Sequence, residues 1–312
     1  MKVIFMGTPD FSIPSLEAIY KSDHKIISVV TQPDKPKGRG MHLSPSPVKE
    51  FALKHDLNVL EPLKIKDNEF IKNLKTLSSD IIVVVAYGKI LPKEVLDIPP
   101  LGCVNLHASL LPKYRGAAPI NWAIINGEKE TGVTTQKMAL KLDSGDILLQ
   151  EKIEILEYDT AGTLHDRLKI IGASLLVKTL DFIEKRNIKP IAQDEKEVSF
   201  APMLKKEDGL IDWENKAENV INLIRGTNPW PSAYTFMSGK LFKIWKATYC
   251  NFNSGKEPGS IIKNGLKLLV QTGDIVISLE EVQLENHKRM SAREFLIGKS
   301  ISEKFDFMKK IH

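Results

Sequence analysis

Two polar side chains, Asn105 and His107, stand at alternate positions at the end of an apolar run, and Asp143 lies in a tight acidic turn further along the chain. An imidazole can take up and release a proton near neutral pH, a buried carboxylate can orient it, and an amide N–H can donate to a developing oxyanion. No serine or cysteine is evidently activated as a nucleophile. The set therefore favours direct transfer of a group to an incoming amine. A structural histidine and a turn aspartate are the alternative interpretation of the same residues.

A polar loop and the acidic turn complete the candidate site. The loop Ser109–Gly116, with the sequence SLLPKYRG, has little local tendency to form a helix or a strand, and the turn spans Leu142–Asp146. In open α/β sheets, ligands bind beyond the carboxyl ends of the strands. If Cys103–His107 is a strand, we expect the loop and the turn to meet the Asn-His pair at that end. A simple packing role for the loop remains open at this point.

The elements that must position these residues alternate between apolar runs and amphipathic segments. This alternation predicts an α/β domain with a Rossmann-like, mostly parallel sheet. No GxGxxG motif follows the first run, so a standard dinucleotide site is not predicted. The predicted strands are Lys2–Met6, Lys25–Thr31, Asn58–Leu60, Ile81–Ala86, Cys103–His107, Gly132–Met138 and Ile147–Ile155. The predicted helices are Pro14–Tyr20, Val48–His55, Asp67–Leu77, Ala118–Asn126 and Thr160–Arg186.

The pattern changes near Ile188. A polar stretch without a long period is followed by one predicted helix, Ala217–Arg225, and by several short strands separated by turns. Short strands at near-regular spacing are typical of a small β-barrel, here an OB-like one. The predicted strands are Ala233–Phe236, Leu241–Ala247, Gly259–Lys263, Lys267–Gln271 and Asp274–Val282. We therefore predict a catalytic domain over 1–189, a linker over 190–207 and a β-barrel domain over 208–312.

Positive charge is concentrated in one segment of the first domain. The whole chain of 312 residues carries a net charge of only +5, which permits an anionic partner without requiring one. The segment Thr31–Lys49 alone carries +3, from Lys35, Lys37, Arg39 and Lys49 against one aspartate. Its central part, Gln32–Pro47, has four prolines and two glycines, and we predict a long exposed loop there. Residues 208–312 carry a further +3.

Composition excludes several classes of protein. The two cysteines, Cys103 and Cys250, are too few for a disulfide scaffold and form no zinc-binding motif, so we expect a reducing compartment, the cytoplasm. The longest apolar run, Ile81–Ala86, is far shorter than the roughly 18 residues that span a bilayer. No four-ligand metal set is visible, and we expect a chemistry without metal. Our expectation for the oligomeric state is a monomer.

The candidate site residues and several other segments together give the chain a resemblance to the methionyl-tRNA formyltransferases along nearly its whole length. The run from Asn105 through SLLP and YRG to AAPI is specific to formyltransferases that use formyltetrahydrofolate. The basic loop and the C-terminal domain point to the tRNA-dependent members. The segments that carry the resemblance are VIFMGTPDF, VVTQPDKPKGRG, SPSPVKEFA, VVVAYGKILP, GCVNLHASLLPKYRGAAPINWAIINGE, TGVTTQKMALKLDSGDIL, IDWENKA and NPWPSAY.

The resemblance implies transfer of a formyl group from 10-formyltetrahydrofolate, as co-substrate, to the α-amino group of methionyl initiator tRNA. Asn105, His107 and Asp143 match the catalytic trio of the family. The residues Ser109, Leu110, Leu111 and Pro112 match its folate-contacting stretch. Arg39 matches the basic residue of the inserted loop that clasps the tRNA, with Lys35 and Lys37 beside it, and Lys206 matches a linker lysine.

Three other functions share parts of this pattern. A sister transferase that formylates an amino sugar on a nucleotide has the same core, but a small substrate gives no reason for a basic loop. A hydrolase that releases formate from the same folate would use the trio with water as the nucleophile. A non-catalytic RNA-binding protein would not need the intact trio.

Overall fold

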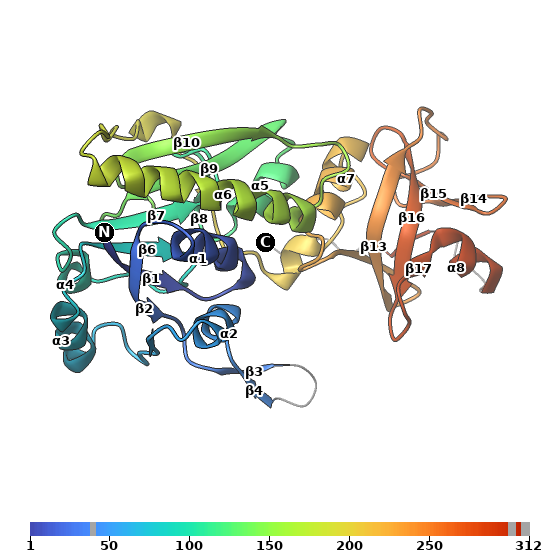
Figure 1. Ribbon diagram of the computed structural model, residues 1–312. Coiled ribbons are helices and arrows are strands. Elements are labelled where there is room, and N and C mark those ends of the chain that lie inside the picture. Colours follow the sequence, from blue (N-terminus) through green and yellow to red (C-terminus); the bar gives the residue numbers. More distant parts are fainter. Residues whose placement is uncertain (38–41, 299–303, 307–312) are drawn as a thin grey trace. The chain divides into compact units, whose positions relative to one another are not determined.

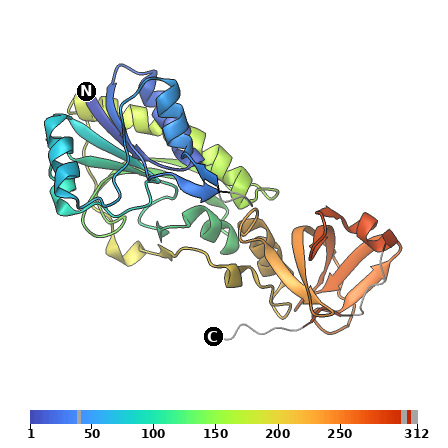
Figure 2. The same cartoon turned by 90° about the horizontal axis from the view of Figure 1, so that it is seen from below.

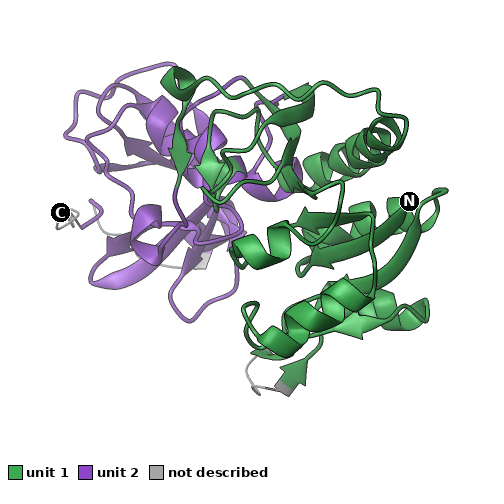
Figure 3. Cartoon of the chain, turned by 90° about the vertical axis from the view of Figure 1, so that its left-hand side faces the viewer, with its two compact units in different colours: residues 1–119, 130–153, 165–201 green, residues 120–129, 154–164, 202–312 purple. Residues whose placement is uncertain are grey.

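The computed structural model describes residues 1–37, 42–298 and 304–306. The chain divides into two compact units (Figure 3). The first comprises residues 1–119, 130–153 and 165–201, and the second comprises 120–129, 154–164 and 202–312. Within the described ranges, no helix combines the length and the apolar character that crossing a membrane requires.

A seven-stranded sheet forms the centre of the first unit (Figure 1). Its order is β10-β9-β7-β6-β1-β2-β5, and the five strands from β7 to β5 pair in parallel, while β9 runs antiparallel to β7. The predicted Rossmann-like, mostly parallel sheet is therefore confirmed. The strands are β1 Lys2–Gly7, β2 Lys25–Val30, β5 Val59–Leu60, β6 Ile81–Val85, β7 Cys103–His107, β9 Glu130–Lys137 and β10 Ile147–Glu154.

Helices cover both faces of this sheet because its central strands are apolar on both sides. On one face, Ile4, Ile82 and Cys103 pack in a cluster with residues of α3 and α4. On the other face, α6 lies across the strands (Figures 1 and 2). A Cβ added at Gly172 of α6 would meet Leu106 of β7 at 2.7 Å. The helices of this unit are α1 Ile13–Tyr20, α2 Pro47–Lys54, α3 Asn68–Thr76, α4 Lys93–Leu96 and most of α6 Ala161–Glu184. The helix α5 Pro119–Ile125 belongs, except for its first residue, to the second unit.

The basic segment contains secondary structure that the sequence does not predict. Instead of an irregular loop over Gln32–Pro47, the strands β3 (Lys35–Lys37) and β4 (His42–Ser44) pair antiparallel, with Lys35 opposite Ser44. The prediction of a loop without strands is therefore wrong. Its apolar pattern is too weak to reveal a short exposed ribbon, which needs no hydrophobic face. The segment between these two strands lies outside the described residues.

The second unit contains an antiparallel sheet in the order β12-β13-β16-β15-β14, with β17 paired to β16. The hydrophobic core of this unit includes Trp213, Phe242 and Phe295, which belong to one buried cluster. A short segment, 304–306, makes one bridge at Phe236 of β12 and another at Ser260 next to β14, so it contacts both edges of the sheet. The elements are α7 Ala217–Gly226, β12 Ala233–Met237, β13 Lys240–Tyr249, β14 Ile261–Asn264, β15 Lys267–Gln271, β16 Val276–Leu284, β17 Met290–Ser291 and α8 Ala292–Gly298.

Candidate active site

The pairing of β7 with β9 places the candidate residues on one face of the sheet. Asn105 lies opposite Gln136, and His107 lies opposite Thr134. Directly opposed residues in a sheet project on the same side, so these four side chains share the face on which Cys103 packs. The predicted strand Cys103–His107 and its alternation are thus confirmed. The site lies at the carboxyl end of β7, where open α/β sheets bind their ligands.

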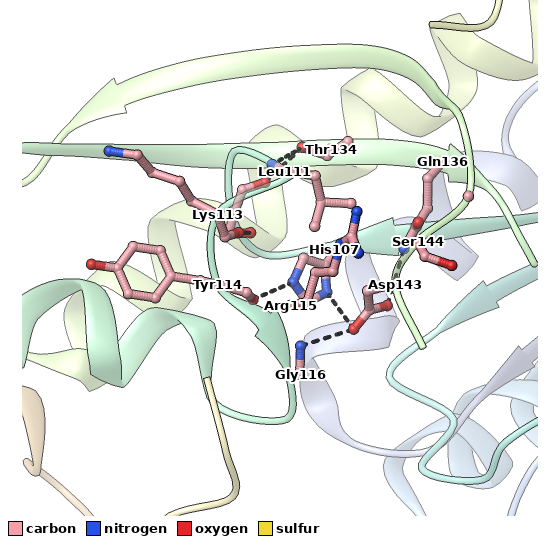
Figure 4. A network of polar contacts seen from close by, with 12 residues as sticks. His107, Leu111, Lys113, Tyr114, Arg115, Gly116, Thr134, Gln136, Asp143 and Ser144 are labelled. Atoms are coloured by element: carbon pink, nitrogen blue, oxygen red, sulfur yellow. Dashed lines mark hydrogen bonds and ion pairs between the residues drawn. The ribbon is translucent and has the colours of Figure 1, made fainter. Parts of the chain in front are cut away.

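His107 lies between a carbonyl oxygen, to which it is hydrogen-bonded, and a carboxylate (Figure 4). The residue is 6% exposed. Nε2 lies 2.9 Å from the carbonyl oxygen of Tyr114, and Nδ1 lies 3.7 Å from Oδ2 of Asp143. Because a carbonyl only accepts, the bond to Tyr114 requires a proton on Nε2. The doubly protonated ring would complement both neighbours, and a positive charge on it would face the carboxylate.

Asp143 reaches His107 from a strained turn. Its φ of 48° lies in the left-handed region, which a residue with a side chain seldom adopts. The backbone N–H of Gly116 donates to Oδ2 at 3.0 Å, and Nε2 of Gln136 donates to Oδ1 at 3.0 Å. Both carboxylate oxygens are therefore fixed, and the geometry aims one of them at the imidazole.

Asn105 differs from its neighbours because its amide is not engaged. The residue is half-buried, and within residues 1–37, 42–298 and 304–306 its side chain makes no hydrogen bond. An amide that has not been paired inside the fold remains able to donate to an atom of a bound molecule. This is the arrangement that stabilisation of an oxyanion requires.

The SLLP loop is held by side chains of β9 and β10. The Leu111 N–H donates to Oγ1 of Thr134 at 3.1 Å, and that hydroxyl donates to the Ser109 carbonyl oxygen at 2.6 Å. Nε2 of Gln150 donates to the Leu111 carbonyl oxygen at 2.8 Å. The Leu111–Pro112 peptide bond is cis. With Leu110 half-buried between them, these four residues form a preformed wall beside His107, not a free loop.

The predicted tRNA-contacting residues are placed only in part. Lys35 is exposed in β3, and its Nζ contacts Oε1 of Gln32. Lys37 ends the same strand, Arg39 lies outside the described residues, and Lys206 is exposed at the start of a single helical turn.

The charge of Lys49, the fourth basic residue of this segment, is balanced by two carboxylates. Lys49 pairs with Asp34 and with Glu61, each at 2.8 Å. The hydrogen bonds to these two carboxylates raise the pKa of its ammonium. Lys49 therefore anchors the base of the ribbon.

Two other reactive side chains are inert by burial. Burial raises the pKa of the Cys103 thiol to about 12 and that of the Tyr87 hydroxyl to about 12. Neither group ionises near neutral pH, so neither supplies a nucleophile. Two groups of residues in the described ranges could gather around a cation, Asp10-His165-Asp166 and His24-Asp181-Glu184, and neither includes a candidate catalytic residue.

Sequence reasoning missed Gln136, and it placed Tyr114 and Gly116 in the candidate loop without their contacts to the trio. Gln136, Gly116 and Tyr114 supply two donors and one acceptor to Asp143 and His107. The only signal for Gln136 was its place in a strand with the right alternation. The contacts of Gly116 and Tyr114 are made by backbone groups, which no residue type reveals.

Comparisons with known proteins identify the family of the chain. A family model described as formyl transferase matches residues 1–180, and one described as formyl transferase, C-terminal domain, matches residues 203–300. A curated relative from Caldanaerobacter subterraneus subsp. tengcongensis, named methionyl-tRNA formyltransferase, is 50% identical over 304 residues, which cover 97% of this chain and 98% of that protein. The chain belongs to the methionyl-tRNA formyltransferase family.

Solved structures show the fold that this family of formyltransferases shares with others. An N-formyltransferase from Helicobacter canadensis, in complex with folinic acid and dTDP-3-aminofucose, matches with a TM-score of 0.69 at 20% identity over 89% of this chain and 98% of that one. HypX from Aquifex aeolicus, in complex with tetrahydrofolic acid, matches with a TM-score of 0.62 at 15% identity over 95% of this chain. The chain spans about half the length of HypX, since the match covers 47% of it.

Proposed function

We propose that this protein transfers the formyl group of 10-formyltetrahydrofolate to the α-amino group of methionyl initiator tRNA. The observation that carries the proposal is the 50% identity to proteins named methionyl-tRNA formyltransferase, which extends over 97% of the chain and so includes the site and the second unit. The arrangement of Asn105, His107 and Asp143 supports a transfer that passes through a tetrahedral intermediate.

In the proposed reaction the amine nitrogen attacks the formyl carbon, and a new C–N bond forms. The bond between the formyl carbon and N10 of the folate then breaks, and its electron pair stays on N10. The proton that the amine loses ends on N10, so no external acid or base is consumed. The α-amine of an aminoacyl ester is less basic than that of a free amino acid, so much of it is neutral and can attack directly.

Each member of the trio has a distinct part in this proposal. The unengaged amide of Asn105 donates to the oxyanion. His107 acts through Nε2, because Nδ1 faces Asp143, and its bond to the Tyr114 carbonyl is the contact that a substrate atom replaces. The carboxylate of Asp143 stabilises the imidazolium while the proton moves from the amine to N10.

The residues present also fit the folate. Asn105, whose amide has no hydrogen-bond partner in the described part of the chain, is joined in the proposed site by the fixed wall formed by Ser109, Leu110, Leu111 and Pro112. Polar groups that converge on a largely apolar wall are typical of a small-molecule site. We propose that this wall contacts the pterin ring, and the reaction itself gives no step that needs a metal.

The tRNA contacts are proposed for two regions. The ribbon strand with Lys35 and Lys37, together with Arg39, which follows it in the sequence, would meet phosphates of the acceptor end, and Lys206 would add a contact from the linker. We propose the roles of catalytic domain for residues 1–189, linker for 190–207 and tRNA-binding domain for 208–312. Contacts of lysine and arginine with phosphates release counterions, so binding should weaken as salt rises. We propose a monomer that acts in the cytoplasm.

The test is a formyl-transfer assay with 10-formyltetrahydrofolate and charged methionyl initiator tRNA. Free methionine, an amino-sugar nucleotide and a reaction without acceptor are run beside it. Labelling of the tRNA alone, weakened by Arg39→Ala and by high salt, supports the proposal. The matched control is Lys75→Ala, an exposed lysine on α3. Labelling of the sugar, or release of formate without an acceptor, would overturn it.

A further inference from the structure

The stretch after α6 returns to the candidate active site. Ile191 exchanges two backbone hydrogen bonds with Ile147 at the start of β10. Further on, β11 (Phe200–Ala201) pairs in parallel with β8 (Arg115–Gly116), directly after the SLLP loop. Residues 191–201 therefore form a strap, fixed at both ends, that passes beside the turn carrying Asp143. All of these residues belong to the first unit.

Gln193 is the strap residue that contacts this turn. Its Nε2 donates to the carbonyl oxygen of Asp143 at 2.9 Å and to that of Gly145 at 2.7 Å. Its Oε1 accepts from Nε of Arg115 at 3.0 Å and from Nη2 at 2.8 Å. Both donors and the acceptor oxygen of this one amide are therefore engaged. The amide joins the turn to the buried arginine.

Arg115 fixes the amide from the other side. Its side chain is 1% exposed, and Nη2 also donates to Glu195 of the strap at 2.9 Å. The guanidinium lowers the pKa of Glu195 through this hydrogen bond. A buried arginine with two acceptors on the strap cannot move without losing them, so it holds the carbonyl oxygen of Gln193 in place and leaves the NH₂ group directed at the turn.

The turn itself needs such a clamp. Asp143 is in the left-handed region, and a side chain at Gly145 would meet the carbonyl oxygen of Lys137 at 1.6 Å, so the turn presses against the end of β9 on that side. Gln193 binds the carbonyl groups of Asp143 and Gly145, two residues of this turn. The direction of the Asp143 carboxylate toward His107 depends on this backbone conformation.

We propose that Gln193 is a positioning residue for the transfer reaction: by binding the carbonyl groups of Asp143 and Gly145, with Arg115 holding its own carbonyl oxygen, it keeps the Asp143 carboxylate aimed at His107. The inference rests on the proposed function, because it assumes that Asp143 acts in formyl transfer. Under this proposal, Gln193 does not contact the substrates. Its effect on the reaction passes through Asp143.

The decisive variant is Gln193→Glu. It keeps the size of the side chain and an acceptor for Arg115, but it replaces the donor NH₂ by an oxygen that faces two carbonyl oxygens. We expect kcat to fall about 10- to 100-fold, the loss typical of a small misplacement of a catalytic group, while KM for each substrate changes less than about twofold. The pH profile of the single-turnover rate should also change shape, which a purely structural role would not cause. If Gln193→Glu folds poorly, Gln193→Ala, which leaves room for water, should show the same fall in kcat with little change in KM.

The control and the double variant separate this inference from the proposed function. The control is Asp194→Asn, because Asp194 is the exposed residue that follows Gln193 in the strap. It should leave the rate unchanged, since asparagine can still cap the helical turn Glu195–Glu197. If Gln193 acts through Asp143, Gln193→Glu should slow the Asp143→Asn variant little further. An undiminished rate in Gln193→Glu, or full additivity with Asp143→Asn, overturns the inference. A normal rate in Asp143→Asn alone would instead overturn the proposed role of Asp143.

Discussion

Replacing Asp143 by asparagine tests the centre of the proposed mechanism. The change preserves the shape of the side chain and removes its charge. Oδ2 lies 3.7 Å from Nδ1 of His107, and the carboxylate side chain is 10% exposed. At an effective dielectric constant of about 20, a full charge pair at this distance is worth about 4 kcal/mol. Water and the amide dipole return part of that energy, so we expect a loss of about 3 kcal/mol in the transition state, or about 100- to 200-fold in rate.

The fold should survive this substitution because Gln136 can adapt. In the native site its Nε2 donates to Asp143, and its Oε1 is buried and has no hydrogen-bond partner within the described residues. A rotation of the Gln136 amide would present this oxygen to the new NH₂ group. The Gly116 N–H would keep the remaining carbonyl oxygen as its acceptor. We therefore expect the melting temperature to fall by only a few degrees.

The assay is single-turnover formylation with enzyme in excess, followed by rapid quenching, together with a thermal melt. Asp146→Asn is the matched control, since Asp146 is exposed three residues further along the same turn. The reasoning is refuted if Asp143→Asn forms product within about threefold of the unaltered rate. It is also refuted if Asp146→Asn loses as much activity as Asp143→Asn.

The other predictions concern Asn105, Gly116 and the two cysteines. Asn105→Ala should lower the single-turnover rate about 100- to 1,000-fold with little change in folate affinity, as removal of an oxyanion donor does; an unchanged rate would assign the oxyanion to another group. Gly116→Ala should destabilise the protein in a thermal melt and reduce its activity, because φ is 130° there and the new carbon would lie 2.5 Å from the Ala201 carbonyl oxygen; an unchanged melting temperature would contradict this. Iodoacetamide at about pH 8 should label half-buried Cys250 before Cys103, whose pKa burial raises to about 12; mass spectrometry of the folded protein would show the reverse order if Cys103 is accessible.

Much of the first unit follows from local sequence patterns. The run Ile81–Ala86 is apolar without interruption, which predicts a central strand covered on both faces, and β6 is fully buried. The ribbon within Gln32–Pro47 could not be predicted in this way. Its strands contain three residues each and bury little apolar surface, so no period of two is present to be detected.

The site was only partly predictable for the same physical reason. Alternation along Cys103–His107 determined that Asn105 and His107 share a face, because successive side chains of a strand point to opposite sides. The sequence also identified Asp143 as a carboxylate in a turn. It contained no information on the conformation of that turn, since a left-handed aspartate has no residue signature of its own.

The sequence by itself determined the order and type of most elements and the residues able to carry the chemistry, since these depend on the local period of apolar side chains and on residue type. Only the tertiary structure decided that Asp143 lies 3.7 Å from His107 and that Gln193, 50 residues beyond Asp143, clamps its turn. Such contacts depend on the pairing of β7 with β9 and of β11 with β8. They form because the sheet folds as a whole and brings together side chains that lie far apart in the sequence, in part through backbone carbonyl groups, which are the same in every residue.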